Sequence, residues 1–197
     1  KDSEEIRAIT GWFPGKYDGK MRFEIPDNEA KWIGPTTAGD VKKLSDAEEP
    51  TVSLAEVFSH PDLQSIYPGF FEKRGWMKVA VSFTKRFAPY EGQLLGNIIE
   101  VGLPRGGETL NAERMANVLL HEIQHWIQRV EDYAKGSSPD DFALLQFSKG
   151  PQAPFDAYHR TAGEIEARDV QARRKLTPEQ RKAIAPYSSE NIAPEDA

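Results

Sequence analysis

The clearest hydrophobic pattern in this sequence lies between residues 111 and 133 and predicts one long helix. Its apolar residues recur at steps of three and four, which places them along one side of a helix. They are Met115, Val118, Leu119, Ile123, Trp126, Ile127 and Val130. Asn111 is of a residue type that caps helix N-termini, and the Gly-Ser-Ser-Pro run at residues 136–139 is typical of a loop that follows a helix.

Alternation of apolar and polar residues predicts strands before this helix. Residues 21–25 and 77–83 alternate in this way, and residues 94–101 are apolar enough for a third strand. Because strands precede the long helix and further helices follow it, we predict an α+β fold. We expect a small mixed sheet packed on the long helix, with further helices toward the C-terminus.

Capping signals predict the shorter helices. Ser53 and Glu56 have the spacing of a capping box, and His60 precedes a proline at another helix start. A later helix is expected from residue 161 to about residue 174, and one more from Thr177 on.

The length of 197 residues is that of one domain of ordinary size. We expect residues 1–185 to form this single domain and residues 186–197 to be a polar, flexible tail. The formal net charge of −6 argues against binding to nucleic acid. No apolar run is long enough to span a bilayer, and the first residues lack the hydrophobic core of a signal peptide, so no membrane partner is expected.

The most informative motif lies on the predicted long helix, where His121, Glu122 and His125 form the pattern H-E-x-x-H. Positions i and i+4 of a helix lie about 40° apart around its axis, so both imidazoles can face one metal ion. Glu122 lies on the same side, where a carboxylate can take a proton from a metal-bound water without binding the metal. The chain has no cysteine, so its metal ligands must be imidazole and carboxylate groups.

A catalytic zinc ion needs a third protein ligand. The metzincin pattern is absent, because Gln128 and Glu131 stand where it requires glycine and histidine. His60 precedes a proline at a helix start, which favours a capping role. Glu164 and Glu166 in the predicted helix 161–174 are better candidates, and because they lie on opposite flanks of that helix only one can face the motif. Periodicity leaves both open.

Two arginines flank the first of these glutamates. Arg160 and Arg168 lie four residues before and after Glu164, so a guanidinium can orient this carboxylate while it binds metal. The alternative is that they form ordinary surface ion pairs. If the chain cleaves peptides, an edge strand must hold the extended substrate, and residues 97–103 are the candidate edge.

Several short segments together carry a family resemblance. The segments are Ile9-Thr10-Gly11-Trp12-Phe13, Tyr17-Asp18-Gly19-Lys20, Arg22-Phe23-Glu24-Ile25, His60-Pro61-Asp62-Leu63, Tyr67-Pro68, Leu120-His121-Glu122-Ile123-Gln124-His125 and Gly163-Glu164-Ile165-Glu166-Ala167-Arg168. They resemble the large polyvalent protein associated domains found in very long proteins of phages and mobile elements. The resemblance extends from about residue 6 to residue 174.

This resemblance implies a zincin-like metallopeptidase fold. The Glu-x-x-Ala spacing from Glu164 to Ala167 is similar to the third-ligand helix of gluzincins, in which the first glutamate binds zinc. It therefore favours Glu164 over Glu166. The chain departs from the gluzincin pattern at Arg168, where many relatives carry aspartate.

We therefore expect a zinc-dependent hydrolase that cleaves peptide bonds of a polypeptide substrate, with His121, His125 and Glu164 as zinc ligands. Glu122 would be the general base that takes a proton from the metal-bound water. The second electrophile at the oxyanion is expected from the segment that precedes the ligand helix. Its candidates are Tyr158, His159 and Arg160.

Two alternatives stay open. The chain can be a non-catalytic structural or interaction module of a polyvalent protein, or a zinc hydrolase that acts on a non-peptide amide such as a cell-wall crosslink. The resemblance also implies that the chain is part of a larger multidomain protein. A cytoplasmic location and delivery with a mobile element both fit the sequence.

Overall fold

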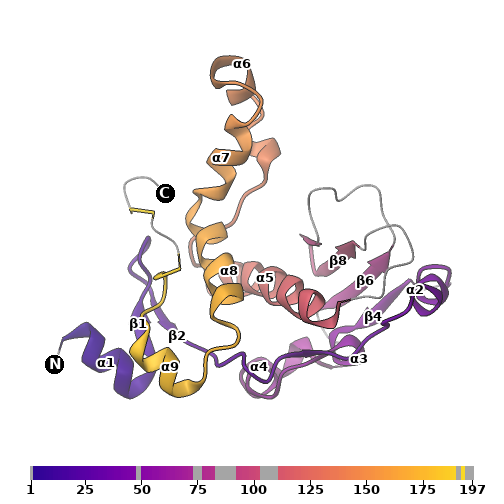
Figure 1. Ribbon diagram of the computed structural model, residues 1–197, viewed down its shortest axis with the longest axis horizontal. Coiled ribbons are helices and arrows are strands. Elements are labelled where there is room, and N and C mark those ends of the chain that lie inside the picture. Colours follow the sequence, from indigo (N-terminus) through magenta and orange to yellow (C-terminus); the bar gives the residue numbers. More distant parts are fainter. Residues whose placement is uncertain are drawn as a thin grey trace. The chain divides into compact units, whose positions relative to one another are not determined.

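The computed structural model describes residues 2–47, 50–72, 77–82, 92–102, 111–189 and 192–193 (Figure 1). It shows an α+β fold with small sheets and several helices, as predicted. The chain divides into two compact units. We call Lys1–Pro26 with Gln124–Ala197 the terminal unit, and Asp27–Ile123 the central unit.

The central unit contains a mixed sheet with the strand order β4-β6-β8-β7. Strands β6 and β8 are parallel, and the two outer pairs are antiparallel. The strands are β4 (Thr51–Ser53), β6 (Lys78–Ser82), β7 (Gly92–Leu95) and β8 (Ile98–Gly102). A second antiparallel pair joins β3 (Lys31–Trp32) to β5 (Phe58–Ser59). The helices are α2 (Ala38–Ser45), α3 (Leu54–Val57), α4 (Pro61–Ile66) and the 3-10 helix η1 (Pro68–Phe70).

The structure corrects two predictions about this sheet. Residues 94–101 are not one strand, because the chain turns at Gly96, whose φ of 61° favours glycine, and returns as β8. The predicted edge at residues 97–103 is also wrong for its described part, since β8 lies between β6 and β7. Among the described strands of this sheet, β4 and β7 are outermost. Residue 83, which ends a predicted strand, and residue 103, which ends the predicted edge segment, lie outside the described residues.

The terminal unit is mainly helical. Its two strands, β1 (Trp12–Pro14) and β2 (Met21–Phe23), form an antiparallel hairpin, so the predicted strand at residues 21–25 pairs with β1 and not with the other predicted strands. The remaining elements are α1 (Ser3–Thr10), the 3-10 helix η2 (Pro139–Phe142), α6 (Leu145–Lys149), α7 (Ala153–His159), α8 (Ala162–Arg173) and α9 (Pro178–Ala183).

The predicted long helix is α5 (Ala112–Val130), and the boundary between the two units falls within it, after Ile123. Asn111 caps its start, because its side-chain oxygen accepts hydrogen bonds from the backbone N–H groups of Glu113 (3.0 Å) and Arg114 (3.2 Å). The helix ends three residues earlier than predicted. Asp132 has a φ of 54°, a left-handed conformation that a helix cannot continue.

The apolar stripe of α5 is buried as predicted, apart from the exposed Val130 at the helix end. Fully burying a side chain of this size contributes about 1.5–3 kcal/mol to folding. The buried residues of the stripe are Met115, Val118, Leu119, Ile123, Trp126 and Ile127. The core of the central unit also includes Leu54, Phe58, Met77, Val79 and Ile99. None of the helices in the described part of the chain is long and apolar enough to cross a membrane.

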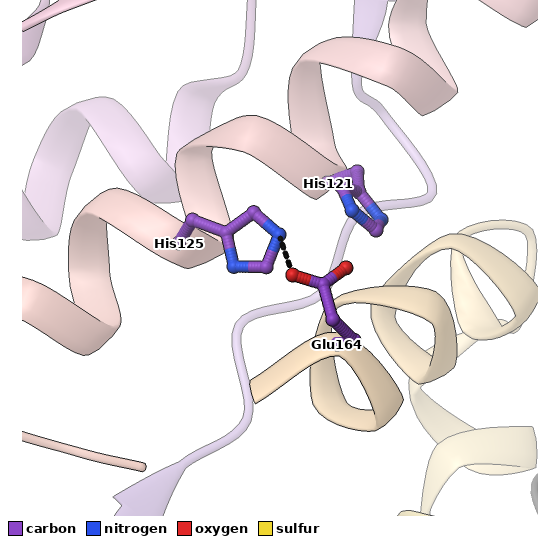
Figure 2. Close-up of side chains that lie close together, drawn as sticks. All are labelled: His121, His125 and Glu164. Atoms are coloured by element: carbon purple, nitrogen blue, oxygen red, sulfur yellow. Dashed lines mark ion pairs between the residues drawn. The ribbon is translucent and has the colours of Figure 1, made fainter. Parts of the chain in front are cut away.

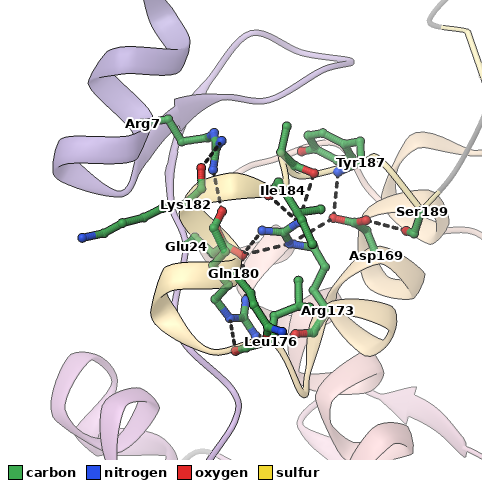
Figure 3. Close-up of polar contacts among 12 residues, drawn as sticks. Arg7, Glu24, Asp169, Arg173, Leu176, Gln180, Lys182, Ile184, Tyr187 and Ser189 are labelled. Atoms are coloured by element: carbon green, nitrogen blue, oxygen red, sulfur yellow. Dashed lines mark hydrogen bonds and ion pairs between the residues drawn. The ribbon is translucent and has the colours of Figure 1, made fainter.

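A buried ionic network holds α8 and α9 to the N-terminal segment of the terminal unit (Figure 3). Glu24 Oε1 accepts hydrogen bonds from Arg173 (2.6 and 2.9 Å) and from Arg181 (2.7 Å). Arg7 donates to the carbonyl oxygens of Arg181 and Lys182 at 2.7 and 2.9 Å. Removing one partner of such a buried network costs roughly 3–5 kcal/mol.

The segment after α9 is packed at its start, where we expected a tail. Tyr187 is 8% exposed, and its backbone N–H donates to Asp169 Oδ2 at 2.8 Å. Ser189 also hydrogen-bonds Asp169 (Figure 3). The start of this segment is therefore hydrogen-bonded to α8.

Candidate metal centre

Helix α5 carries both histidines of the motif, and α8 carries the carboxylate that faces them. His121 and His125 are half-buried and lie one turn apart on one uninterrupted helix. Glu164 is 1% exposed and lies in the first turn of α8. One ligand atom from each of the three residues lies within 4.8 Å of the other two. Figure 2 shows the carboxylate of Glu164 pointing toward both imidazole rings.

The donor set and the spacing fit a zinc ion. Zinc binds imidazole nitrogen and carboxylate oxygen at about 2.0–2.2 Å, so that two ligand atoms of one tetrahedral ion lie roughly 3–4 Å apart. His125 Nε2 is 3.1 Å from Glu164 Oε1, which already matches this separation. The separations that involve the donor atom of His121 are no longer than 4.8 Å.

Glycines allow the backbone to pass close to this pair. A Cβ atom at Gly136 would lie 2.5 Å from both Glu164 Oε1 and His125 Cε1. A Cβ atom at Gly163 would lie 2.1 Å from the backbone nitrogen of Gly136. Real Cβ atoms do not approach other atoms so closely, so a side chain at Gly163 would require the backbone to move, and one at Gly136 would displace the side chains of Glu164 and His125. Next to Gly136, the backbone N–H of Ser137 donates to Glu164 Oε1 at 3.2 Å and helps to orient the carboxylate.

Glu166, the other candidate for third ligand, faces away from the histidine pair. Its carboxylate accepts hydrogen bonds from Arg22 Nε, from the hydroxyl of Tyr187 (2.9 Å) and from the side-chain amide of Gln128 (3.0 Å). The helix period left the two glutamates equivalent, and the structure places only Glu164 with His121 and His125.

Gln128 and Arg22 connect this second carboxylate to the site. Gln128 is 0% exposed, and its side-chain oxygen lies 3.0 Å from His125 Nδ1. Its amide nitrogen donates to the carbonyl oxygen of Gly163 at 2.9 Å as well as to Glu166. Sequence reasoning missed both residues, although a polar side chain on the buried side of α5, three positions after His125, was a usable signal for Gln128.

Charged partners determine the ionisation around Glu166. Burial disfavours the charged form of Arg22, but its hydrogen bonds to Asp18 and the charge of Glu166 raise its pKa above the ordinary value. Burial, together with the nearby charge of Glu166, raises the pKa of Tyr187 well above its ordinary value, so this phenol stays neutral and donates. The hydrogen bonds from Arg22 lower the pKa of Asp18 from 3.8 to about 2.

Glu122 is buried in the central unit, 6% exposed, beside strand β7. A Cβ atom at Gly92 would lie 3.2 Å from Glu122 Oε1 and 2.5 Å from Val118 Cγ1. Glycine at this position therefore lets the backbone of an outermost strand lie against the Glu122 side chain. The motif glutamate is held in a packed environment and is not solvated on a helix surface.

The residues expected to supply a second electrophile lie at the end of α7. The His159 ring packs against Phe155 (4.6 Å between centroids) and Tyr158 (5.1 Å). Arg160 is exposed, and Arg168 donates to the carbonyl oxygen of His159 at 2.6 Å, which ties α8 to α7. Among the described residues, His159 is not part of the histidine and glutamate group.

His60 has the capping role that the sequence favoured. It is 1% exposed, and its Nδ1 accepts the backbone N–H of Leu63 at 3.2 Å at the start of α4. Its Nε2 lies 2.8 Å from Asp27 Oδ1. Both ring nitrogens therefore have protein partners, and neither is directed to the metal-ligand group.

One family model matches a part of the chain. Residues 1–33 match the family described as large polyvalent protein associated domain 23, which supports the resemblance noted from the sequence. The matched segment includes Arg22, whereas the three residues of the candidate metal group lie outside it. No curated protein and no solved structure matches the chain.

Proposed function

We propose that this protein is a zinc-dependent hydrolase, a metallopeptidase, in which His121, His125 and Glu164 bind the metal. The observation that carries the proposal is the grouping of these three donor atoms within 4.8 Å, two from an H-E-x-x-H helix and one from α8. The glycine at position 136 adds support, because any side chain there would fill the space beside the ligand atoms.

The three ligands would hold the metal, and Glu122 would transfer the proton. Zinc bound there would act as a Lewis acid, which lowers the pKa of water and polarises a carbonyl group. His121, His125 and Glu164 would leave one position open, as catalytic zinc sites do. Glu122 would take the proton from the attacking water, and its packing against β7 would keep its carboxylate in one position.

A polypeptide substrate agrees with the position of β7. This strand is outermost in the described sheet of the central unit, and its Gly92 is next to Glu122. Extended peptides bind to strand edges through main-chain hydrogen bonds. Tyr158, His159 and Arg160 remain the proposed source of the second electrophile, because they immediately precede the helix of Glu164.

Metal content and hydrolysis, measured together on matched variants, test this proposal. The wild-type chain should hold one zinc ion and cleave unfolded polypeptide. Glu122→Gln should keep the zinc and lose activity by about 10²–10⁴-fold, because Glu122 is a base and not a ligand. Glu113→Gln, the same change in the exposed first turn of α5, should alter neither quantity. Loss of zinc from Glu122→Gln would contradict the assignment.

Two further measurements separate this function from its competitors. Glu164→Ala should weaken zinc binding more than Glu166→Ala does, and the reverse ranking would transfer the ligand role. A zinc-loaded wild-type chain that leaves unfolded polypeptide intact and cleaves peptidoglycan would identify a non-peptide amide as substrate. A chain inactive on both, with zinc closed by a fourth protein ligand, would be a structural module.

A further inference from the structure

We infer that Gln128, fixed by Glu166 and Arg22, is a positioning residue that keeps a proton on Nδ1 of His125 and leaves Nε2 as the metal-binding nitrogen. The ligand role of His125 rests on the proposed function. The location of the proton follows from hydrogen bonds within the terminal unit.

The contacts of the Gln128 side-chain amide determine its orientation. Its nitrogen lies 2.9 Å from the carbonyl oxygen of Gly163 and 3.0 Å from Glu166 Oε2. A carbonyl oxygen and a carboxylate oxygen can only accept hydrogen bonds, so the donating NH₂ group must face them. The flipped amide would place oxygen against two acceptors in a fully buried position, and this costs far more than the hydrogen bonds are worth.

The orientation of Gln128 determines which nitrogen of His125 carries the proton. With the amide nitrogen on Glu166 and Gly163, the amide oxygen of Gln128 faces His125 Nδ1 at 3.0 Å. An amide oxygen cannot donate, so Nδ1 must carry the proton. In a neutral imidazole the other nitrogen then has a lone pair, which for His125 is Nε2.

Other donors also hold the carboxylate of Glu166 in place. Arg22 donates to both oxygens of its carboxylate, and Tyr187 donates to Oε1 at 2.9 Å. Arg22 is itself fixed by Asp18, at 2.7 and 2.9 Å, and by the carbonyl oxygen of Lys20 at 2.8 Å. Both oxygens of the Glu166 carboxylate therefore face donors, and an amide oxygen of Gln128 turned toward Oε2 would face an acceptor.

The position of the proton on Nδ1 also determines what His125 presents at Nε2. Nε2 of His125 lies 3.1 Å from Glu164 Oε1, and in this tautomer both atoms present lone pairs to each other. Two facing acceptors repel unless a cation lies between them or close to both. The hydrogen bonds behind His125 therefore prepare Nε2 and the Glu164 carboxylate for a metal ion, and they do so through a residue that touches neither metal nor substrate.

Nitrogen-15 NMR of the His125 ring in metal-free protein tests the inference directly. At about pH 8.5, well above the ordinary imidazole pKa of about 6.5, the wild-type ring should carry its proton on Nδ1. Gln128→Met removes the amide at similar length, so the proton should move to Nε2, where Glu164 can accept it. Tyr187→Phe is the matched control, because it removes a hydrogen bond to the opposite oxygen of Glu166 and should leave the proton on Nδ1.

Zinc titration supplies a second readout. Gln128→Met should weaken zinc binding by about 10–100-fold, the usual effect of losing the partner of a ligating histidine. Tyr187→Phe should change zinc binding by less than about threefold, although it removes one buried hydrogen bond. A proton on Nε2 in the wild-type ring, or the same proton position in wild type and Gln128→Met, would overturn the inference. A wild-type ring with the proton on Nδ1 in a chain that binds no zinc would overturn the proposed function and leave the proton assignment standing.

Discussion

His60 in the central unit and His125 in the terminal unit are both held by hydrogen bonds to a protein partner, but they are held differently. His60 uses both ring nitrogens inside the protein, one for the backbone N–H of Leu63 and one for Asp27. His125 uses Nδ1 for Gln128 and directs Nε2 toward Glu164. The first arrangement stabilises a helix start, whereas the second leaves a nitrogen that can bind a metal.

In these two histidines, the partners of the ring nitrogens determine whether a nitrogen is left to face another ligand group. A backbone N–H donates to Nδ1 of His60, so the ring carries its proton on Nε2, and this N–H donates a hydrogen bond to Asp27 Oδ1. Gln128 imposes the opposite tautomer on His125. Substitutions at the two positions should therefore affect different quantities.

The largest effect is expected for His125→Ala. This change removes a proposed ligand, so zinc affinity should fall by more than about 100-fold, beyond the loss typical of an outer hydrogen-bonding partner. The free energy of unfolding of the metal-free protein should change far less, since His125 is half-buried. Isothermal titration with zinc and denaturant unfolding measure the two quantities. Unchanged zinc affinity would exclude His125 as a ligand.

His60→Ala should show the reverse. It removes the cap of α4 and leaves the buried Asp27 without its imidazole, so the free energy of unfolding should fall by about 3 kcal/mol. Zinc affinity of the folded protein should stay within about twofold of wild type, as expected for sites with no shared partner. If zinc affinity instead fell as it does in His125→Ala, the division of roles between the two histidines would be wrong.

A smaller effect on both quantities is expected for Gly136→Ala. The new Cβ would collide with Glu164 and His125, and relieving such overpacking costs about 1–3 kcal/mol. Because the displaced atoms are proposed ligands, zinc affinity should fall with stability. Gly39→Ala is the matched control, since its Cβ meets no atom closer than 3.9 Å. Equal zinc affinity in the two variants would show that the backbone does not need to pass so close to the ligands.

The smallest effect concerns pH. The pKa of Asp18 is about 2 in the folded protein against 3.8 ordinarily, mainly because Arg22 hydrogen-bonds it. A lowered carboxyl pKa stabilises the folded protein above pH 3.8, and this contribution is lost as pH falls toward 2. In Asp18→Asn the free energy of unfolding should therefore decline less steeply between these pH values. Parallel pH profiles for the variant and the wild type would show that the contact between Asp18 and Arg22 does not stabilise the folded protein.

Local patterns predicted much of the secondary structure. The apolar stripe and the Asn111 cap indicated α5, and capping signals indicated α3, α4 and α9, because these features depend on residues within one or two turns. The sheet was predicted less well. Strand β2 alternates like β6, yet it pairs with β1 in the terminal unit, since pairing partners depend on the course of the whole chain.

The candidate metal group shows the same division. The sequence alone determined that His121 and His125 lie one turn apart on one side of a helix, because this follows from helix geometry. Helix periodicity left Glu164 and Glu166 equivalent, the family resemblance favoured Glu164, and neither gave Gln128 a role. The tertiary structure places Arg22 against Glu166 and the histidine pair against Glu164. Arg22 and Glu166 lie 144 positions apart, and the histidine pair is also distant from Glu164 along the chain, so these contacts are set by packing, which no local pattern records.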